Sequence, residues 1–297
     1  MKKKYFLIAN QLNWFKKNYP QLGGIKCAKY LNIPIKTLHN QAALYGIKID
    51  TKIRKEIKRQ NVINIWKKKR EERNKKSKLI KINSKEKAYI SGLLWGDGYL
   101  HHSKNGHTFY PSIELQKSDF DTVKVLFSCF GKWIISYRQS KQTDCKRKPQ
   151  GVAYLTDPIF GLFLANNDYT IKKSTVKPTK ILALIPERLK KYWWRGYIDA
   201  DGCFYINEKI SYTRQFSLAG SYNQNWKEFE TLLQKLNIKF KTVKRIQGRK
   251  MSRNSIVRIT NTKDIVKLGN YIYGKNYDNI GLKRKYNKYL LIKAKLT

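Results

Sequence analysis

Residues 193 to 206 read WWRGYIDADGCFYI, and residues 89 to 102 read YISGLLWGDGYLHH, which is a rougher copy. Each stretch has apolar residues at helical spacing and then an aspartate followed by a glycine. Asp97 and Asp201 occupy equivalent places, at a period of about 104 residues. Because only two copies occur, the repetition predicts a pseudo-dimer of one structural unit rather than an open array.

Small residues recur four positions apart in both stretches. They are Gly92 and Gly96 in the first copy and Gly196 and Ala200 in the second. Residues at this spacing share one face of a helix, and small side chains let two helix backbones approach closely. We therefore expect the two helices to pack side by side, with their terminal aspartates together.

Two carboxylates at helix C-termini oppose the helix dipoles and repel each other. That arrangement is unfavourable without a cation, and converging carboxylate oxygens with open positions suit Mg²⁺. We predict a site for Mg²⁺ or Mn²⁺ at Asp97 and Asp201, with Gly96 and Ala200 beside them. Such ions can activate a water and stabilise the leaving oxygen of a phosphodiester. The alternative, that each aspartate only caps a loop, suits a single Asp-Gly pair better than two equivalent ones.

The 297-residue chain has 63 Lys and Arg against 20 Asp and Glu, a formal net charge of +43. The excess spans the whole chain and is typical of a protein that binds nucleic-acid phosphates. A membrane surface is the weaker alternative, because no run of 18 apolar residues occurs and no signal peptide is recognisable. We expect an intracellular protein, in the cytoplasm of a bacterium or phage-infected cell or in an organelle (mitochondrion or chloroplast).

The cysteines and histidines do not predict a metal site. The four cysteines form no CxxC pair, so we expect reduced thiols rather than a zinc site or a disulfide scaffold. The stretch HHSKNGH, residues 101 to 107, is expected to be a solvated turn with basic contacts to phosphate. The stretch itself contains no acid or cysteine to complete a ligand set.

Residues 1–47 resemble a small all-α helix-turn-helix DNA-binding domain. A first helix is expected to end at Pro20 and the glycine pair that follows it. Two short helices then surround a turn at Asn32, a residue type that tolerates a left-handed backbone. The second of them, beginning near Pro34, would offer polar residues to a groove of DNA: Lys36, Thr37, His39, Asn40 and Gln41. A purely structural three-helix cap is the alternative.

Residues 48–83 are dominated by Lys and Arg and are predicted to be a basic, partly helical linker that can lie along a DNA backbone. The pattern that follows is mixed α and β, and the order αββαββα occurs in 84–183 and again in 184–297. This predicts an α+β fold of two pseudo-symmetric repeats. Strands are expected at 109–115, 132–139, 152–156, 203–209, 214–220, 238–247 and 254–260.

The stretches SGLLWGDGY and RGYIDADGC resemble the two motif copies of the LAGLIDADG homing endonuclease family in its single-chain, two-repeat form. The resemblance implies a site-specific double-stranded DNA endonuclease whose metal ligands are the acids directly before the final glycines, Asp97 and Asp201. Asp199 is then structural. The first copy departs from the motif at Trp95 and Gly96, but both ligand positions are intact, so we expect an active nuclease.

The same resemblance implies further residues that assist catalysis near the cleavage site. A polar residue at a strand end, Gln116 with Lys117 next to it, would lie near the cleavage water, and Gly220 or Ser221 takes that place in the second repeat. Lys173 and Lys285 would stabilise the charge of the reacting phosphate or polarise water. The alternative for each lysine is one more phosphate or solvent contact.

Each repeat would form a four-stranded saddle in the major groove, and the target should be long and asymmetric because the halves differ. Which face each strand residue presents depends on register, which the sequence does not settle. Candidate contacts are Lys117, Tyr137, Arg138, Gln139, Lys141, Tyr205, Asn207, Arg214, Gln215, Arg245, Gln247 and Arg249. We expect a monomer acting as a pseudo-dimer. The rivals are an intron maturase that binds host-intron RNA and a DNA-binding regulator that does not cleave.

Overall fold

The computed structural model describes residues 7–103, 108–139, 148–170, 172–207, 213–247, 252–274 and 277–296. It divides into two compact units, Met1–Glu72 and Arg73–Thr297. Lys141 and Arg249, two of the predicted DNA contacts, lie outside the described residues, as does the side chain of Gln247. The described cysteines, Cys27, Cys129 and Cys203, are free thiols.

The first unit contains helices α1 (Ala9–Leu31) and α2 (Ile35–Leu44). Their core is formed by Phe15, Tyr19, Cys27, Ala28, Leu38 and Ala42. The turn between the helices places Asn32 in the left-handed region, at φ 51°. The first helix was predicted to end at Pro20 and the glycine pair, and only the glycine part of that prediction is right. The helix continues through Pro20 and breaks at Gly23, where φ is 73°, because glycine adopts this conformation without steric cost.

The basic stretch is one long helix, α3 (Thr51–Ser77). Asp50 caps it, since its Oδ1 accepts hydrogen bonds from the main-chain N–H groups of Lys52 at 2.8 Å and Ile53 at 3.3 Å. Lys, Arg, Gln and Glu are good helix formers, so a sequence that cannot build a core of its own can still be helical throughout. Among its described residues only Ser77 is buried, which leaves the cationic side chains in solvent.

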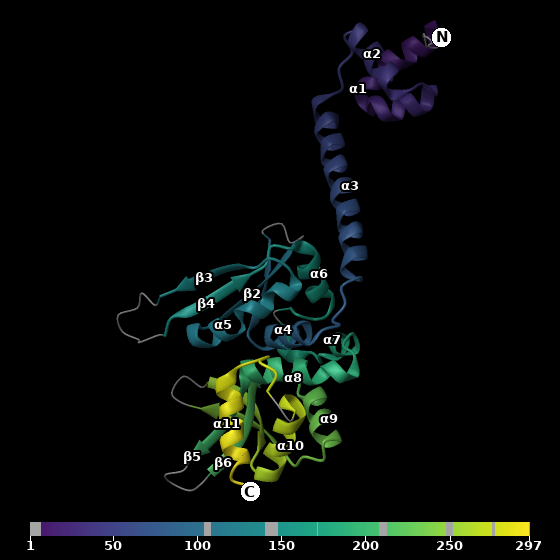
Figure 1. Cartoon of the computed structure of the whole chain (residues 1–297). Coiled ribbons are helices and arrows are strands. Elements are labelled where there is room, and N and C mark those ends of the chain that lie inside the picture. The colour runs from purple at the N-terminus through teal and green to yellow at the C-terminus, as the bar shows by residue number, and fades with distance from the viewer. Residues whose placement is uncertain are drawn as a thin grey trace. The chain divides into compact units, whose positions relative to one another are not determined.

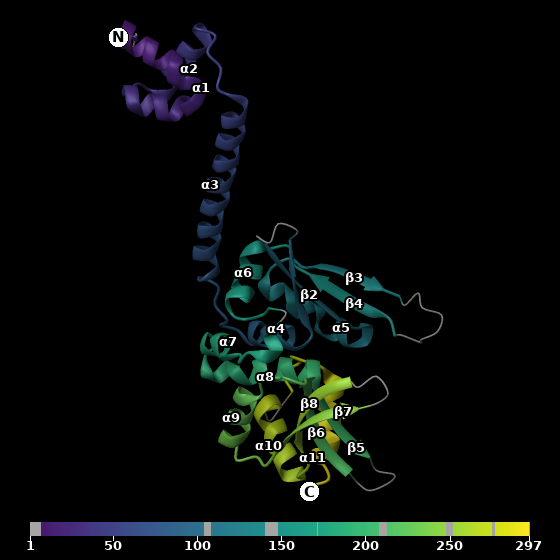
Figure 2. The same ribbon diagram turned by 180° about the vertical axis from the view of Figure 1, so that it is seen from behind.

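The second unit contains the two repeats (Figures 1 and 2). The first consists of α4 (Lys85–Gly96), β1 (Gly98–His102), β2 (Phe109–Gln116), α5 (Lys117–Val123), β3 (Ile134–Arg138), β4 (Gln150–Tyr154) and α6 (Pro158–Asn166). The short helix α7 (Thr179–Ala183) follows. The second consists of α8 (Glu187–Asp201), β5 (Gly202–Asn207), β6 (Thr213–Ser221), α9 (Lys227–Lys235), β7 (Lys241–Gln247), β8 (Ser252–Ile259), α10 (Thr262–Tyr273) and α11 (Lys283–Lys293).

Each repeat has one four-stranded antiparallel sheet, of order β1-β2-β4-β3 in the first and β5-β6-β8-β7 in the second. The predicted α+β class with two equivalent repeats is confirmed. One expectation is wrong: His101 and His102 lie in strand β1 and not in a turn. Their strand pairs with β2 and alternates between exposed Tyr99 and His101 and buried Leu100, the period-2 pattern of a half-buried strand.

Helices α4 and α8 lie side by side between the two repeats (Figures 1 and 2). Ser84 caps α4 by accepting a hydrogen bond from the Lys87 N–H, and α8 begins directly after Pro186. Their side chains join one hydrophobic core that extends through both repeats. Within the described part of the chain, no helix combines the length and apolar character needed to cross a bilayer.

Candidate active site

The contact between α4 and α8 is made by the four small residues of the repeated stretch. A methyl group at Gly92 would lie 1.9 Å from the main-chain oxygen of Trp193, and one at Gly196 would lie 2.1 Å from that of Tyr89. A methyl group at Gly96 would meet the Cβ of Ala200 at 2.2 Å. The helix backbones touch directly, which is possible only because these side chains are small.

The two aspartates lie where each of these helices passes into a strand. Asp97 is the C-cap of α4 and Asp201 is the last residue of α8, and Gly98 and Gly202 begin the strands that follow. Burial and the negative charge of Asp97 raise the pKa of Asp201 to about 7. Asp97 keeps an exposed edge, but protein atoms surround its carboxylate, and this desolvation raises its pKa as well.

Lys173 and Lys285 bind the ends of the two helices. The Lys173 ammonium donates to the main-chain oxygens of Leu94 at 3.1 Å, Gly96 at 2.8 Å and Gly98 at 2.5 Å. An ammonium has three N–H donors, so this set uses all of them. The cation also lies at the negative end of the α4 dipole, where it is favoured.

Lys285 does the same for α8. Its ammonium donates to the main-chain oxygens of Ile198 at 2.9 Å, Asp199 at 2.5 Å and Gly202 at 2.7 Å. Burial lowers the pKa of both lysines, that of Lys173 to about 8, against the opposing effect of the aspartate charges. Through the family resemblance, the sequence predicted both lysines near the reacting phosphates. It contained no signal for these main-chain partners, which lie 75 to 87 residues away along the chain.

Asp199, the other acid of the second stretch, is buried beneath the site. Its Oδ2 accepts hydrogen bonds from the Tyr89 hydroxyl at 2.9 Å and from the Leu282 N–H at 2.8 Å. In the first repeat Trp95 stands at the equivalent position and packs on Tyr169 and Trp193 instead. A carboxylate that links α8 to α4 and to the chain before α11 has a structural role.

The site has the donor set of a hard divalent cation. Desolvation raises the pKa of both carboxylates, and the charge of Asp97 raises that of Asp201 further; a bound cation would relieve both effects. Gly96 lies next to the Asp201 carboxylate. The Gly96 oxygen already accepts from Lys173, but a carbonyl oxygen has a second lone pair. No group of three or more His, Cys, Asp or Glu gathers among the described residues. A cation here would therefore depend on one carboxylate from each repeat.

A cavity of about 370 Å³ opens beside Asp201. Its lining includes Lys173 and the end of β6, where Gly220 and Ser221 had been expected near the cleavage water. The remaining lining residues are Trp95, Gly96, Ser174, Tyr197, Ala219 and Gln224. In the first repeat Gln116 takes the place of Ser221, since Gly98 pairs with Ile113 as Gly202 pairs with Leu218. The Gln116 Nε2 donates to the Ser118 hydroxyl at 3.0 Å.

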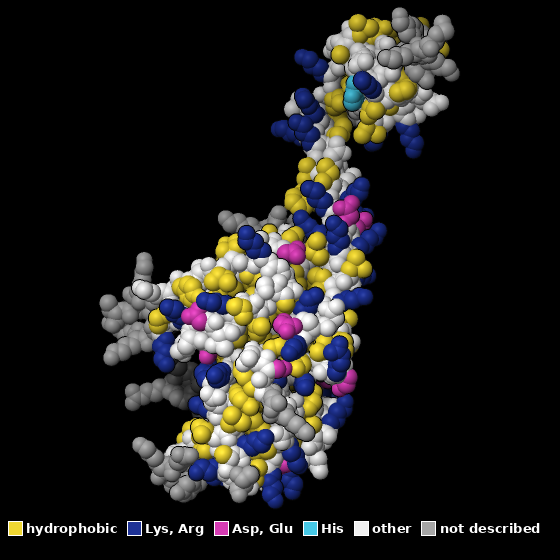
Figure 3. Space-filling view, viewed as in Figure 1, with side chains coloured by type: hydrophobic (Ala, Val, Ile, Leu, Met, Phe, Trp, Pro, Cys, Tyr) yellow, Lys and Arg dark blue, Asp and Glu magenta, His cyan; other side chains and the backbone are white. Residues whose placement is uncertain are grey.

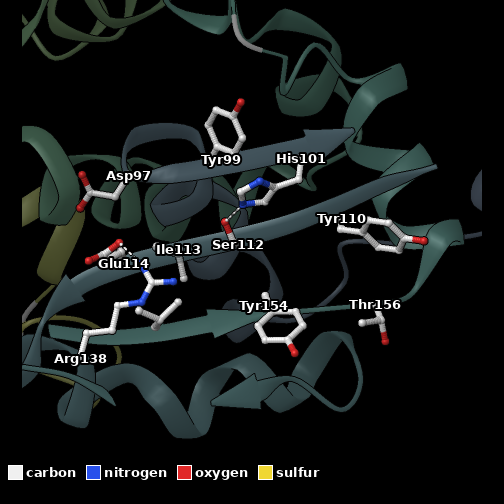
Figure 4. Close-up of a pocket in the computed structure, with 11 residues that line it drawn as sticks. Asp97, Tyr99, His101, Tyr110, Ser112, Ile113, Glu114, Arg138, Tyr154 and Thr156 are labelled. Atoms are coloured by element: carbon white, nitrogen blue, oxygen red, sulfur yellow. Dashed lines mark hydrogen bonds and ion pairs between the residues drawn. The ribbon is translucent and has the colours of Figure 1, made fainter. Parts of the chain in front are cut away.

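A larger hollow of about 810 Å³ lies over the exposed face of the first sheet (Figure 4). Asp97 lies at one end, and aromatic and polar side chains extend along the strands from it. Arg138, a predicted DNA contact, lies here and forms an ion pair of 3.6 Å with Glu114. The other lining residues are Tyr99, His101, Tyr110, Ser112, Ile113, Val152, Tyr154 and Thr156. His101 Nε2 lies 2.7 Å from the Ser112 hydroxyl.

In the second sheet, strand register shows which predicted contacts share the exposed face. Asn207 pairs with Thr213, Gln215 with Tyr205, and Arg245 with Asn254, all on the face of exposed Tyr205. Arg214 is an exception. It pairs with Ile206 and lies on the same side of β6 as the buried Phe216, so it does not belong to the exposed row.

Two candidates of the first repeat also differ from the expected positions. Tyr137 lies on the helix-covered side of β3, where its hydroxyl donates to Asp121 at 2.6 Å. Lys117 begins α5 and its ammonium lies over the ring of Tyr137, 5.6 Å from the centroid. Gln139 is exposed just beyond β3.

The candidates of the first unit lie on α2. Leu38 and Ala42 turn inward to its core. The side chains of Lys36, His39 and Asn40 are exposed, and those of Thr37 and Gln41 are half-buried. His39 lies against α1, since a methyl group at Gly24 would be 2.3 Å from its Nε2.

Comparison with known proteins gives a match that covers the second repeat: residues 194–295 match the family described as LAGLIDADG endonuclease. A comparison with curated proteins gave no match. Similar solved structures include "The homing endonuclease I-WcaI bound to its DNA recognition sequence", 20% identical, covering 72% of this chain and 91% of that chain with a TM-score of 0.48. Another is the LAGLIDADG homing endonuclease I-GzeII in complex with DNA target, 11% identical, covering 70% and 90% with a TM-score of 0.45.

The matched segment carries the second half of α8, the second sheet and Lys285. The first repeat has the same helix, the same strand order and its own lysine on the same helix end. The second repeat therefore matches the LAGLIDADG endonuclease family, and the first repeat, which lies outside the matched segment, has the same strand order.

Proposed function

We propose that this chain is a site-specific endonuclease that cuts both strands of DNA and depends on Mg²⁺, which Mn²⁺ can replace. The observation that carries the proposal is the pair of carboxylates, one from each repeat, at the ends of two helices in direct backbone contact. Two acids related by pseudo-symmetry suit a reaction that is performed once on each strand.

Asp97 and Asp201 would hold the cation, with main-chain oxygens of Gly96 and Ala200 near it. A bound divalent ion activates water and stabilises the leaving oxygen of a phosphodiester. Lys173 and Lys285 hold the two helix ends in place and reduce the negative charge around the carboxylates. The end of β6, at Ser221, and the end of β2, at Gln116, would orient the attacking water.

The exposed faces of the two sheets would read the target in the major groove. The first face is rich in aromatic side chains, whereas the second presents amide and guanidinium groups, so the half-sites would differ in sequence. Lys and Arg side chains are spread over the face seen in Figure 3, where acids are few. Helix α2 and the basic helix α3 would add contacts beyond the sheets.

The two repeats would take the place of two subunits, so the protein would act as a monomer inside the cell. Host-intron RNA is a second ligand that the same basic surface could bind. The paired carboxylates favour cleavage over RNA binding and over DNA binding without cleavage. Both of these alternatives are outcomes of the test below.

The test begins by selecting, from a random-sequence duplex library, the DNA that the full-length protein binds. We expect cleavage of that duplex with Mg²⁺ and none with Asp97→Asn or Asp201→Asn. Asp168→Asn is the matched control, since it removes an acid whose partner is Lys180. Undiminished cutting by either active-site variant contradicts the metal assignment. Tight binding without any cutting by the natural protein indicates a regulator, and stimulated splicing of an intron RNA indicates a maturase.

A further inference from the structure

The two halves of the site are not chemically equal. Gln116 and Ser221 occupy equivalent places in β2 and β6, but the chain after them differs: α5 begins directly at Lys117 and carries Asp119, whereas Gln224 lies in the connection before α9. One half therefore has a carboxylate on the helix that follows the strand, and the other has a neutral amide in the connection. Gln224 lines the cavity beside Asp201, and its Nε2 donates to the Tyr197 hydroxyl at 3.3 Å.

Asp119 is buried and is bound by an arginine of the other repeat. Arg284 Nε donates to Asp119 Oδ1 at 2.6 Å, and its terminal nitrogen donates to Oδ2 at 2.5 Å. This two-pronged pair joins α11 to α5 across 165 residues of sequence. Arginine–carboxylate pairs of this geometry fix orientation as well as distance, which a lysine cannot do.

Arg284 directly precedes Lys285, the residue that binds the end of α8. The pair with Asp119 therefore fixes the start of α11 and, with it, the Lys285 ammonium. Among charged neighbours, Lys285 has the largest effect in lowering the pKa of Asp97, and Asp119 raises it, so these groups lie close to the Asp97 carboxylate. In the other half the residue before Lys173 is Lys172, whose side chain is exposed.

We propose that Arg284 and Asp119 are a positioning pair for the Asp97 half of the site, and that this pair makes the two strand-cleavage steps unequal. The inference rests on the proposed nuclease function. The pair itself would not contact the DNA or the reacting atoms; it acts by holding Lys285, whose positive charge stabilises the Asp97 carboxylate. Its loss should slow the cleavage of one strand and leave the other nearly unchanged.

The experiment uses the duplex selected with the natural protein, with a different dye on each strand, in single-turnover cleavage with Mg²⁺. Arg284→Met should slow one strand by roughly 10- to 100-fold, the loss expected for a displacement of about 1 Å at a reacting centre. The other strand should change by less than about threefold. Asp119→Asn should slow the same strand, and Arg284→Lys should give an intermediate rate on that strand.

Two controls separate positioning from general damage. Lys172→Met alters the equivalent residue of the other half, which lacks the carboxylate partner. Lys124→Met removes the exposed ion pair with Asp121 on the segment that follows Asp119. Both should leave both strand rates unchanged. Unfolding temperature and DNA binding without Mg²⁺ are measured for every variant, and Asp119→Asn carries the test if Arg284→Met does not fold.

Equal slowing of both strands by Arg284→Met and Asp119→Asn, or no slowing of either, overturns the inference. The charge exchange Asp119→Arg with Arg284→Asp gives a second readout, since recovery of the slow strand shows that the pair itself is required. If the natural protein binds the duplex and does not cut it, the proposed function fails and this inference fails with it. Cutting of both strands with no selective effect refutes the inference alone.

Discussion

Gly92 should not tolerate even a single methyl group. An alanine Cβ at this position would lie 1.9 Å from the Trp193 oxygen, whereas an ordinary contact between carbon and oxygen is about 3.3 to 3.6 Å. The oxygen belongs to the backbone of α8 and cannot rotate away. Helices α4 and α8 must therefore separate by roughly 1.5 Å at this point.

The expected cost is about 3 kcal/mol, at the upper end for overpacking of a core. For a folded unit of this size, such a loss lowers the unfolding temperature by roughly 6 to 12 °C. In an isolated helix, replacing glycine by alanine stabilises the helix by about 1 kcal/mol. A loss of stability therefore indicates that the packing of α4 against α8 outweighs helix propensity at this position. Cleavage should fall about 100-fold because the two aspartates at the helix ends move apart.

The assay is thermal unfolding together with single-turnover cleavage of the selected duplex. Ser91→Ala is the matched control, because Ser91 is buried on the same helix and its hydroxyl donates only within it, to the Lys87 oxygen at 2.8 Å. It should cost less than about 1 kcal/mol. The double variant of Gly92→Ala and Gly196→Ala should cost less than the sum of the single variants, since one separation accommodates both methyl groups. Unchanged or increased stability of Gly92→Ala would refute the reasoning.

Three other changes test the charges around the site. Lys285→Met leaves three main-chain oxygens at the end of α8 without their donor, and we expect a loss of about 2 to 4 kcal/mol in denaturant unfolding; no loss would contradict the role of the helix-end lysine. Asp201→Asn removes the repulsion with Asp97 and should raise the unfolding temperature in metal-free buffer while cleavage is lost; a lower temperature would count against the repulsion. Burial alone would raise the pKa of Asp278, but hydrogen bonds from Tyr192 and Arg195 outweigh it, and the pKa is lowered from 3.8. Ionised Asp278 therefore stabilises the folded state at neutral pH, and this contribution is lost as the pH falls below 3.8. Unfolding temperature from pH 7 to 3 should therefore fall less for Asp278→Asn than for the natural protein; equal slopes would contradict the assignment.

The regular elements were predictable where the sequence pattern is long and periodic. The strands β2, β6 and β8 and the helices α8 and α10 lie where alternation and helical spacing placed them, and β4 begins two residues earlier than predicted. Strand β1 was missed because it is short and its exposed residues include two histidines next to a polar run. The first helix continues past Pro20, where the proline costs the helix one hydrogen bond and does not end it. The helix breaks at Gly23, because a positive φ cannot continue a helical backbone.

The site was predictable only in part. The repeated Asp-Gly ends identified Asp97 and Asp201, and the small residues explained why two helices could meet. The partners of Lys173, Lys285 and Arg284 were not predictable, because each lies at least 75 residues away in the sequence. No local pattern encodes a contact at that distance.

The sequence by itself determined the duplication, the two close-packing helix faces and the acids at their ends, since these follow from spacing and side-chain size. It also determined the large positive charge. Only the tertiary structure decided which lysine binds which helix end, which strand residues share the exposed face, and which half of the site has the Arg284–Asp119 pair. Those features depend on strand register and on contacts between distant segments, which form only when both repeats are packed on α4 and α8.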